Sequence, residues 1–142
     1  MIPMLALACL ILAPQISLAA DLVVYKSPYC GCCADWIKHM ETNGFSVEVH
    51  NREDMDKVKK EMGIPSPLAS CHTGEIGGYL VEGHVPAEDV RRLLKEKPEV
   101  KGIAVPGMPV GSPGMEVPGQ KPDSYKVVTF TREGKVKTFS SH

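Results

Sequence analysis

The sequence predicts a single α/β domain, and three observations support this prediction. The chain has 142 residues, of which 43% are hydrophobic and 23% charged, as in an ordinary one-domain globular protein. Short β-branched apolar runs alternate with runs at helical spacing, in the order β-α-β-α-β-β-α. A Gly/Pro-rich stretch and a final hairpin pattern follow. The net charge of −1 gives no indication of nucleic acid or an anionic membrane as a partner.

Residues 1–20 are predicted to be a signal peptide, which leaves a domain at 21–142. The leader is apolar over Leu5–Leu12, too short a run for a comfortable membrane span, and Ser17–Ala19 has the small-x-small form of a cleavage site. It carries no Lys or Arg before the apolar run, so an uncleaved anchor remains the alternative. Export predicts a periplasmic protein without a membrane segment after cleavage, and Cys9 is lost with the leader.

The first half of the domain is predicted as two strand–helix units. Leu22–Lys26 is short, apolar and β-branched, which is typical of a buried strand. Residues 32–43 follow as a helix whose apolar positions share one face and which Gly44 ends. The same pattern repeats, with an alternating strand at 45–50 and a helix at 53–62.

The second half is predicted as a hairpin, a helix, a long loop and a second hairpin. The first hairpin spans 68–82 around a Gly-rich turn, and Pro86 opens a helix at 87–97. Residues 102–119 contain four prolines, which excludes a helix or a central strand. Because this loop also carries apolar residues, we expect it to wrap around the domain and cover one edge. A hairpin at 125–139 closes the chain.

Four cysteines dominate the chemistry of the domain. Three lie together as Cys30-Gly31-Cys32-Cys33, and Cys71 is followed by His72. Such a density of sulfur suits thiol–disulfide exchange or a soft metal ion. Two purely structural disulfides are disfavoured, because a bridge between the neighbours Cys32 and Cys33 is strained. The C-x-x-C pair lies at a helix start, where the helix dipole favours thiolates.

The element order, with a C-x-x-C pair at the first helix and a proline before the third strand, resembles the thioredoxin fold. This resemblance implies that the third strand begins beside the C-x-x-C loop. We therefore expect Cys71 to lie near the other three cysteines and His72, its strand neighbour, to point to the opposite face. The resemblance also implies a cis proline, for which Pro67 is the candidate.

Spacing and softness favour Cu(I), with Cys30, Cys32, Cys33 and Cys71 as ligands. Zinc ribbons space their ligands differently, whereas thiolate sulfur can bridge several Cu(I) ions, so we predict more than one ion. Four further residues are weaker candidates, each with an ordinary alternative. His72 is an extra ligand or a surface histidine, and His84 an accessory ligand or a polar residue at a helix start. Met108 and Met115 are soft ligands or fill gaps under the loop.

An enzyme is the alternative from another class. In a periplasmic thiol–disulfide oxidoreductase, Cys30 is the nucleophile and Cys33 the resolving thiol. Cys32 counts against it, because a third thiol competes in the exchange, and no general acid or base is evident near the motif. A hybrid, in which the dithiol couple exchanges electrons with copper, stays open. Because a Cys30–Cys33 disulfide removes two thiolates, we expect oxidation to release copper.

A more specific resemblance rests on five features together. They are the Cys30–Cys33 motif, Trp36, Ser70-Cys71-His72-Thr73, Glu82-Gly83-His84-Val85-Pro86 and the loop GIAVPGMPVGSPGMEVPG at 102–119. The combination resembles the DUF411 family, whose characterised members are CopG-type copper-resistance proteins. This implies a periplasmic thioredoxin-like protein of copper homeostasis that binds Cu(I) through the four cysteines and works with other periplasmic copper-handling proteins. Storage, transfer and oxidation or reduction of copper all remain open.

Overall fold

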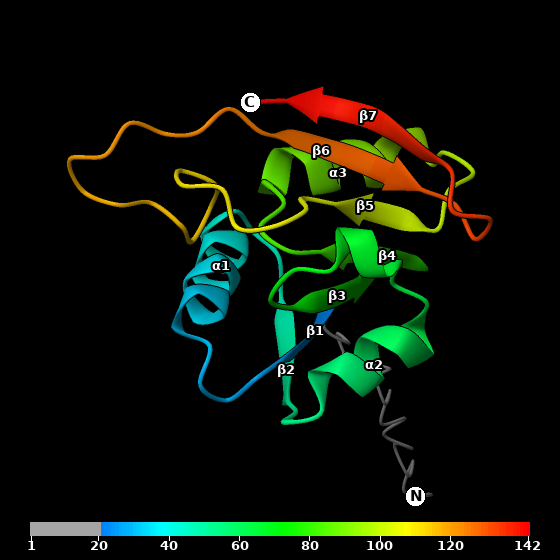
Figure 1. Ribbon diagram of the computed structural model, residues 1–142, viewed down its shortest axis with the longest axis horizontal. Coiled ribbons are helices and arrows are strands. Elements are labelled where there is room, and N and C mark those ends of the chain that lie inside the picture. Colours follow the sequence, from blue (N-terminus) through cyan, green and yellow to red (C-terminus); the bar gives the residue numbers. More distant parts are fainter. Residues whose placement is uncertain (1–20) are drawn as a thin grey trace, which may run out of the picture.

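The computed structural model describes residues 21–142, and the predicted signal peptide lies outside the described residues. Within this range the chain forms one seven-stranded mixed sheet with helices on both faces (Figure 1). The strands are β1 (Leu22–Lys26), β2 (Val47–Asn51), β3 (Thr73–Ile76), β4 (Tyr79–Glu82), β5 (Gly102–Ala104), β6 (Lys126–Phe130) and β7 (Val136–Ser141). The helices are α1 (Gly31–Thr42), α2 (Met55–Met62), α3 (Ala87–Glu96) and the 3-10 helix η1 (Ser66–Leu68). No helix in 21–142 is long and apolar enough to cross a membrane.

The sheet order is β2-β1-β3-β4-β5-β6-β7. β1 pairs in parallel with β2, and β4 pairs in parallel with β5. Parallel neighbours need a crossover, which α1 and α3 supply in turn. All other neighbours are antiparallel. The pairing of β1 with β3 matters most for function, because it brings the chain before β3 next to the chain that leaves β1.

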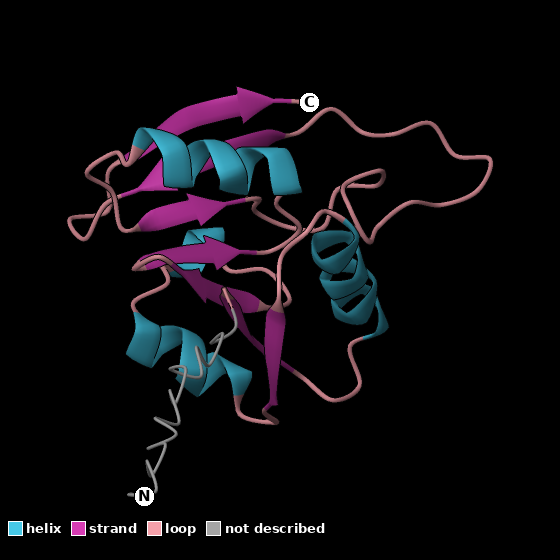
Figure 2. Ribbon diagram, turned by 180° about the vertical axis from the view of Figure 1, so that it is seen from behind, coloured by secondary structure: helices cyan, strands magenta, loops and turns pink. Residues whose placement is uncertain are grey.

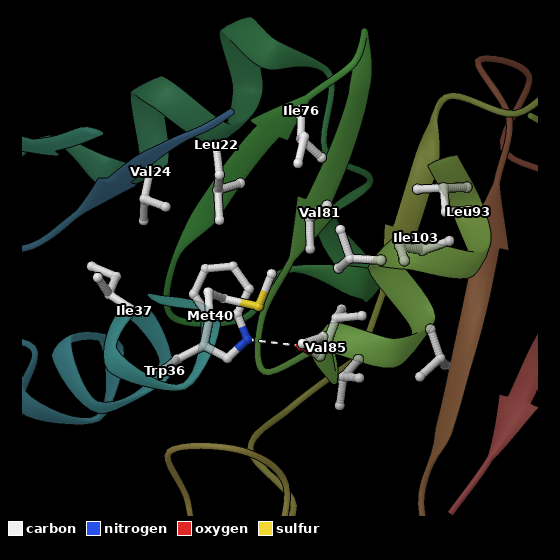
Figure 3. Packing of buried hydrophobic residues seen from close by; sticks show 14 residues of the cluster. Leu22, Val24, Trp36, Ile37, Met40, Ile76, Val81, Val85, Leu93 and Ile103 are labelled. Atoms are coloured by element: carbon white, nitrogen blue, oxygen red, sulfur yellow. Dashed lines mark hydrogen bonds between the residues drawn. The ribbon is translucent and has the colours of Figure 1, made fainter. Parts of the chain in front are cut away.

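One face of the sheet carries the main core. Trp36, Ile37 and Met40 of α1 pack with Leu22 of β1 and with the apolar face of α3 (Figure 3). The Trp36 Nε1–H group donates a hydrogen bond to the carbonyl oxygen of Val85 at 2.8 Å, which ties α1 to the chain entering α3. The α2–η1 segment covers the opposite face through a smaller cluster of Ile64, Leu68, Leu80, Ala104 and Phe130.

The prediction of a single mixed α/β domain is confirmed, and the element order is compatible with the thioredoxin-like arrangement. Three details of the prediction were wrong. The first hairpin strand begins at Thr73 rather than at residue 68, because 66–68 form a 3-10 turn. Pro67 lies in that turn, and its peptide bond, like all others in 21–142, is trans.

The third error concerns the start of the Gly/Pro-rich stretch. Gly102 to Ala104 form β5, a central strand between β4 and β6, because the prolines begin only at Pro106. A side chain at Gly102 would collide with the carbonyl oxygen of Leu80 on β4, so glycine permits this close strand pairing.

The long loop after β5 lies over helix α1 and not over an edge strand of the sheet. The two edge strands are β2 and β7. The loop between β5 and β6 instead extends past α1, as both views show (Figures 1 and 2). The loop packs tightly at Gly114, where a Cβ atom would lie 2.8 Å from both the Cys32 carbonyl oxygen and the Trp36 nitrogen. The loop therefore lies directly on the first turns of α1, where the cysteine motif is.

Candidate metal site

Four cysteine sulfurs meet where α1 begins. Cys30 is the N-cap residue of α1, and Cys32 and Cys33 lie in its first turn. Cys71 lies in the segment before β3, which β1 holds beside the motif through the pairing of Tyr25 with Thr73. One ligand atom from each of the four cysteines lies within 4.8 Å of the others. The expected proximity of Cys71 to the C-x-C-C motif is therefore present in the structure.

The cysteines are present in two chemical states. Cys30 and Cys33 form a disulfide, whereas Cys32 and Cys71 are free. The Cys32 sulfur lies 3.6 Å from the Cys30 sulfur and 4.0 Å from the Cys71 sulfur. Cys33 is fully buried, and the other three cysteines are partly exposed, so the free thiols remain accessible.

His84 places a ring nitrogen in contact with this sulfur group. Its Nε2 atom lies 2.8 Å from the Cys71 sulfur, and its Nδ1 atom lies 2.7 Å from the carbonyl oxygen of Pro113 in the long loop. Because a carbonyl can only accept, Nδ1 carries the proton and the Nε2 lone pair faces Cys71. The sequence left His84 open between a helix-start residue and an accessory ligand, and the structure places it, fully buried, against Cys71.

Burial keeps the cysteine–histidine pair uncharged. It raises the pKa of the Cys71 thiol to about 11, and it lowers the pKa of His84 despite the Pro113 hydrogen bond, which acts in the opposite direction. The Cys71 thiol therefore donates to a neutral imidazole at neutral pH. A metal ion that binds the sulfur has to displace this proton.

His72 contradicts the expectation that it points away from Cys71, and of its two alternatives, an extra ligand or a surface histidine, the structure excludes the surface histidine. It is fully buried instead of lying at the surface, and its Nδ1 atom lies 3.7 Å from the Cys71 sulfur instead of on the opposite face. Strand alternation does not apply, because β3 begins only at Thr73. The ring contacts Trp36 at 4.3 Å and His84 at 5.0 Å between centroids.

The Nε2 atom of His72 is the one buried side-chain nitrogen or oxygen in 21–142 that has no hydrogen-bond partner. Burial is the main reason why the pKa of His72 lies well below its ordinary value, and the neighbouring His84 lowers it further. The ring is therefore neutral, and the ring nitrogen that carries no proton is available to bind a metal. Cys71, His72 and His84 form a second group of ligand atoms within 4.8 Å that shares Cys71 with the first.

A buried ion pair beneath the Cys71 segment was not predicted from the sequence. The Lys59 ammonium group donates to the Glu82 carboxylate at 2.6 Å and to the Thr73 hydroxyl at 3.0 Å. The same carboxylate accepts the backbone N–H of Ser70 at 2.8 Å and the Thr73 hydroxyl at 2.5 Å. Glu82 thus holds the residues on both sides of Cys71 and His72. The sequence signal that could have indicated this pair was Lys59, a charged residue at an inward-facing position of α2.

The two methionines of the long loop differ in their exposure to solvent. Met108 is 52% exposed, and Met115 is partly buried. The Ser70 hydroxyl donates to the Gly107 carbonyl oxygen at 2.6 Å, which brings the chain next to Met108 against the Cys71 segment. A ligand role for either methionine stays a prediction.

Comparison with known proteins agrees with this site. Residues 68–115 match the family described as "Protein of unknown function, DUF411". Two solved structures of a copper resistance protein CopG, Form 1 and Form 2, are each 50% identical to the chain over 85% of its length. The chain belongs to the DUF411 family. The alignments cover 95% and 96% of the CopG chains, with TM-scores of 0.79 and 0.80. No curated protein sequence matches the chain.

The resemblance to the DUF411 family inferred from the sequence is thus confirmed. The matched segment contains Cys71, both buried histidines and both loop methionines, whereas the C-x-C-C motif precedes it. This relative of a copper resistance protein therefore has a cysteine-rich site that could hold a metal.

Proposed function

We propose that this protein binds Cu(I) in a multinuclear thiolate cluster and serves copper homeostasis or resistance. The observation that carries the proposal is the convergence of Cys30, Cys32, Cys33 and Cys71 within 4.8 Å. Four thiolates in so small a volume repel one another unless soft cations lie between them. Since each thiolate sulfur can bridge two Cu(I) ions, several ions balance the charge of the four ligands.

The surroundings of the sulfur group favour a soft, weakly hydrated cargo. His72 and His84 add neutral imidazole nitrogens on the protein side of Cys71, and burial excludes water from both rings. The likeness to copper resistance protein CopG supports copper over zinc. We further propose an exported, periplasmic protein that loses residues 1–20 and exchanges copper with other periplasmic proteins.

A metal titration tests this proposal. We expect the fully reduced protein, held anaerobically, to bind more than one Cu(I) per chain in competition with a chelator. We expect Cys32→Ser and Cys71→Ser to lower the number bound, because each removes a ligand. Saturation by one Zn(II) with weaker copper binding would instead indicate a structural zinc site.

A thiol–disulfide oxidoreductase is the second candidate, because Cys30 and Cys33 are joined in the structure. In that mechanism a substrate thiolate attacks one sulfur and breaks the Cys30–Cys33 bond to give a mixed disulfide. A second substrate thiol resolves the mixed disulfide, so the substrate becomes a disulfide and two electrons pass to the protein. Two Cu(I) ions oxidised to Cu(II) could deliver the same two electrons. A Cys32→Ser protein that kept full copper binding but lost disulfide exchange would favour an oxidoreductase in which Cys32 is also a working thiol.

A further inference from the structure

The disulfide leaves half of the sulfur group in the thiol state. Cys32 and Cys71 are free while Cys30 and Cys33 are bonded, and the two free sulfurs lie 4.0 Å apart. Metal–sulfur bonds of about 2.3 Å place two sulfurs this far apart when they meet at an angle of about 120°. The separation therefore suits one ion bound by both sulfurs, with an open side for a third ligand.

A further soft donor lies beside Cys71. His84 directs its Nε2 lone pair at Cys71 from 2.8 Å, and Pro113 holds the ring in this tautomer through Nδ1. Two thiolates form a soft donor pair that accepts Cu(I), and the imidazole of His84 lies beside the Cys71 sulfur. None of these three side chains takes part in the disulfide, so the set persists when Cys30 and Cys33 are oxidised.

We propose that the Cys30–Cys33 disulfide sets the number of Cu(I) ions bound instead of preventing binding. The disulfide form holds one Cu(I) between Cys32 and Cys71, and reduction of the disulfide opens the multinuclear site. This inference rests on the proposed function and revises the expectation that oxidation releases all copper. The protein then keeps a single ion under oxidising conditions and gains capacity when it is reduced.

Protons and electrons balance both in copper binding by the disulfide form and in its conversion to the reduced form. Binding of one Cu(I) by the disulfide form replaces the protons of the Cys32 and Cys71 thiols and changes no oxidation state. Conversion to the high-capacity form breaks the Cys30–Cys33 bond with two electrons and two protons from a dithiol, which becomes a disulfide in turn. The two new thiols then add their sulfurs to the set.

Copper titration of the two redox forms of the full protein tests the proposal. The disulfide form is prepared with a mild oxidant and checked for two free thiols per chain with a chromogenic thiol reagent. Cu(I) is added anaerobically without thiol reductant, and native mass spectrometry counts ions and confirms that the disulfide is intact. We expect one Cu(I) on the disulfide form and more than one on the reduced form.

Two variants assign the ion to its ligands. The double variant Cys30→Ser/Cys33→Ser cannot form the disulfide, so it should bind one Cu(I) both with and without oxidant. Cys71→Ser should form the disulfide normally and bind no Cu(I) in that state. Circular dichroism of each variant checks that the fold is kept.

The outcomes separate this inference from the proposed function. If the disulfide form binds no copper while the reduced form binds several ions, the inference is wrong and the proposed function stands. If neither form binds copper, the proposed function fails. The inference is also wrong if mild oxidation joins Cys32 to Cys71, or if Cys71→Ser keeps its ion in the disulfide form.

Discussion

Two buried polar clusters lie on either side of the segment before β3, and they differ in how many of their atoms find a partner. In the first, the Lys59 ammonium group, the Glu82 carboxylate, the Thr73 hydroxyl and the Ser70 amide satisfy one another at 2.5–3.0 Å. Each of these polar groups has a partner within the protein, and the Lys59 and Glu82 charges neutralise each other. Its role is to fix the chain that carries Cys71.

The second cluster, of sulfurs and imidazoles, is not closed in this way. Four sulfurs are crowded within 4.8 Å, and the Nε2 atom of His72 has no partner. Buried polar atoms without partners cost free energy, so folded proteins keep them mainly where a ligand or a reaction needs them. The Lys59–Glu82 cluster is therefore structural, whereas the sulfur–imidazole cluster is available to a ligand.

The largest expected effect comes from breaking the Lys59–Glu82 cluster. Glu82→Gln leaves the Lys59 ammonium group buried without its counter-charge, and removal of one partner of a buried ion pair costs about 3–5 kcal/mol. We expect a loss of unfolding free energy of this order, measured by urea denaturation of the metal-free disulfide form. The Lys59→Met/Glu82→Gln double variant removes both charges and should regain most of the loss.

Equal stability of the single and double variants would show that the ion pair is solvated in the folded protein. In that case the first cluster would not be closed, and the comparison with the sulfur–imidazole cluster would fail. The double variant also shows whether Cu(I) binding needs the ion pair itself or only the hydrogen bond that residue 82 accepts from Ser70. Its glutamine can still accept the Ser70 N–H bond, so Cu(I) binding should survive in it.

A smaller effect is expected from displacing the loop between β5 and β6, which lies over the sulfur–imidazole cluster. Gly114 and Gly119 both have positive φ, at 88° and 80°, but a Cβ atom at Gly114 meets α1 and one at Gly119 meets nothing within 4 Å. Left-handed backbone costs other residues about 1–2 kcal/mol. We expect Gly119→Ala to lose about 1 kcal/mol and Gly114→Ala about 2–3 kcal/mol, because overpacking adds to the strain.

The same pair of variants tests whether the loop supports metal binding. Only Gly114→Ala should also weaken Cu(I) binding in a chelator competition, because only there is the loop displaced from Cys32 and His84. Equal effects of both variants on copper would show that the loop acts on the site through stability alone.

The sequence predicted the parts of this arrangement that depend on local pattern. The two strand–helix units and the cysteine motif at the start of α1 follow from hydrophobic spacing and helix signals, which act over a few residues. Cys71 was placed near the motif only through the resemblance to the thioredoxin fold, because no local signal brings together residues 39 positions apart. The prediction of the metal ligands still awaits the copper titration.

The remaining features depend on contacts that a sequence pattern does not encode. The burial of His72 follows from the turn at 66–68, which delays β3 and removes the alternation that we expected. The contact of Gly114 with α1 and the Lys59–Glu82 pair each join distant segments through packing. Gly102 begins a central strand because glycine permits close pairing, although prolines follow nearby.

The smallest expected effect concerns the unpaired nitrogen of His72. Burial lowers its pKa in the folded protein, whereas the unfolded chain has the ordinary value of 6.5. Below about pH 6.5 the unfolded chain therefore takes up a proton that the folded chain does not, and the unfolding free energy falls as the pH falls. For one such group the slope is at most about 1.4 kcal/mol per pH unit.

His72→Phe removes this titration and keeps an aromatic ring against Trp36. We expect little change in unfolding free energy at about pH 7.5 and a shallower loss of stability towards about pH 5.5, measured on the metal-free protein by urea denaturation. Some slope should remain, because burial also lowers the pKa values of His39 and His84. An unchanged slope in His72→Phe would mean that His72 is protonated or paired in the folded protein, and the sulfur–imidazole cluster would then be as closed as the Lys59–Glu82 cluster beside it.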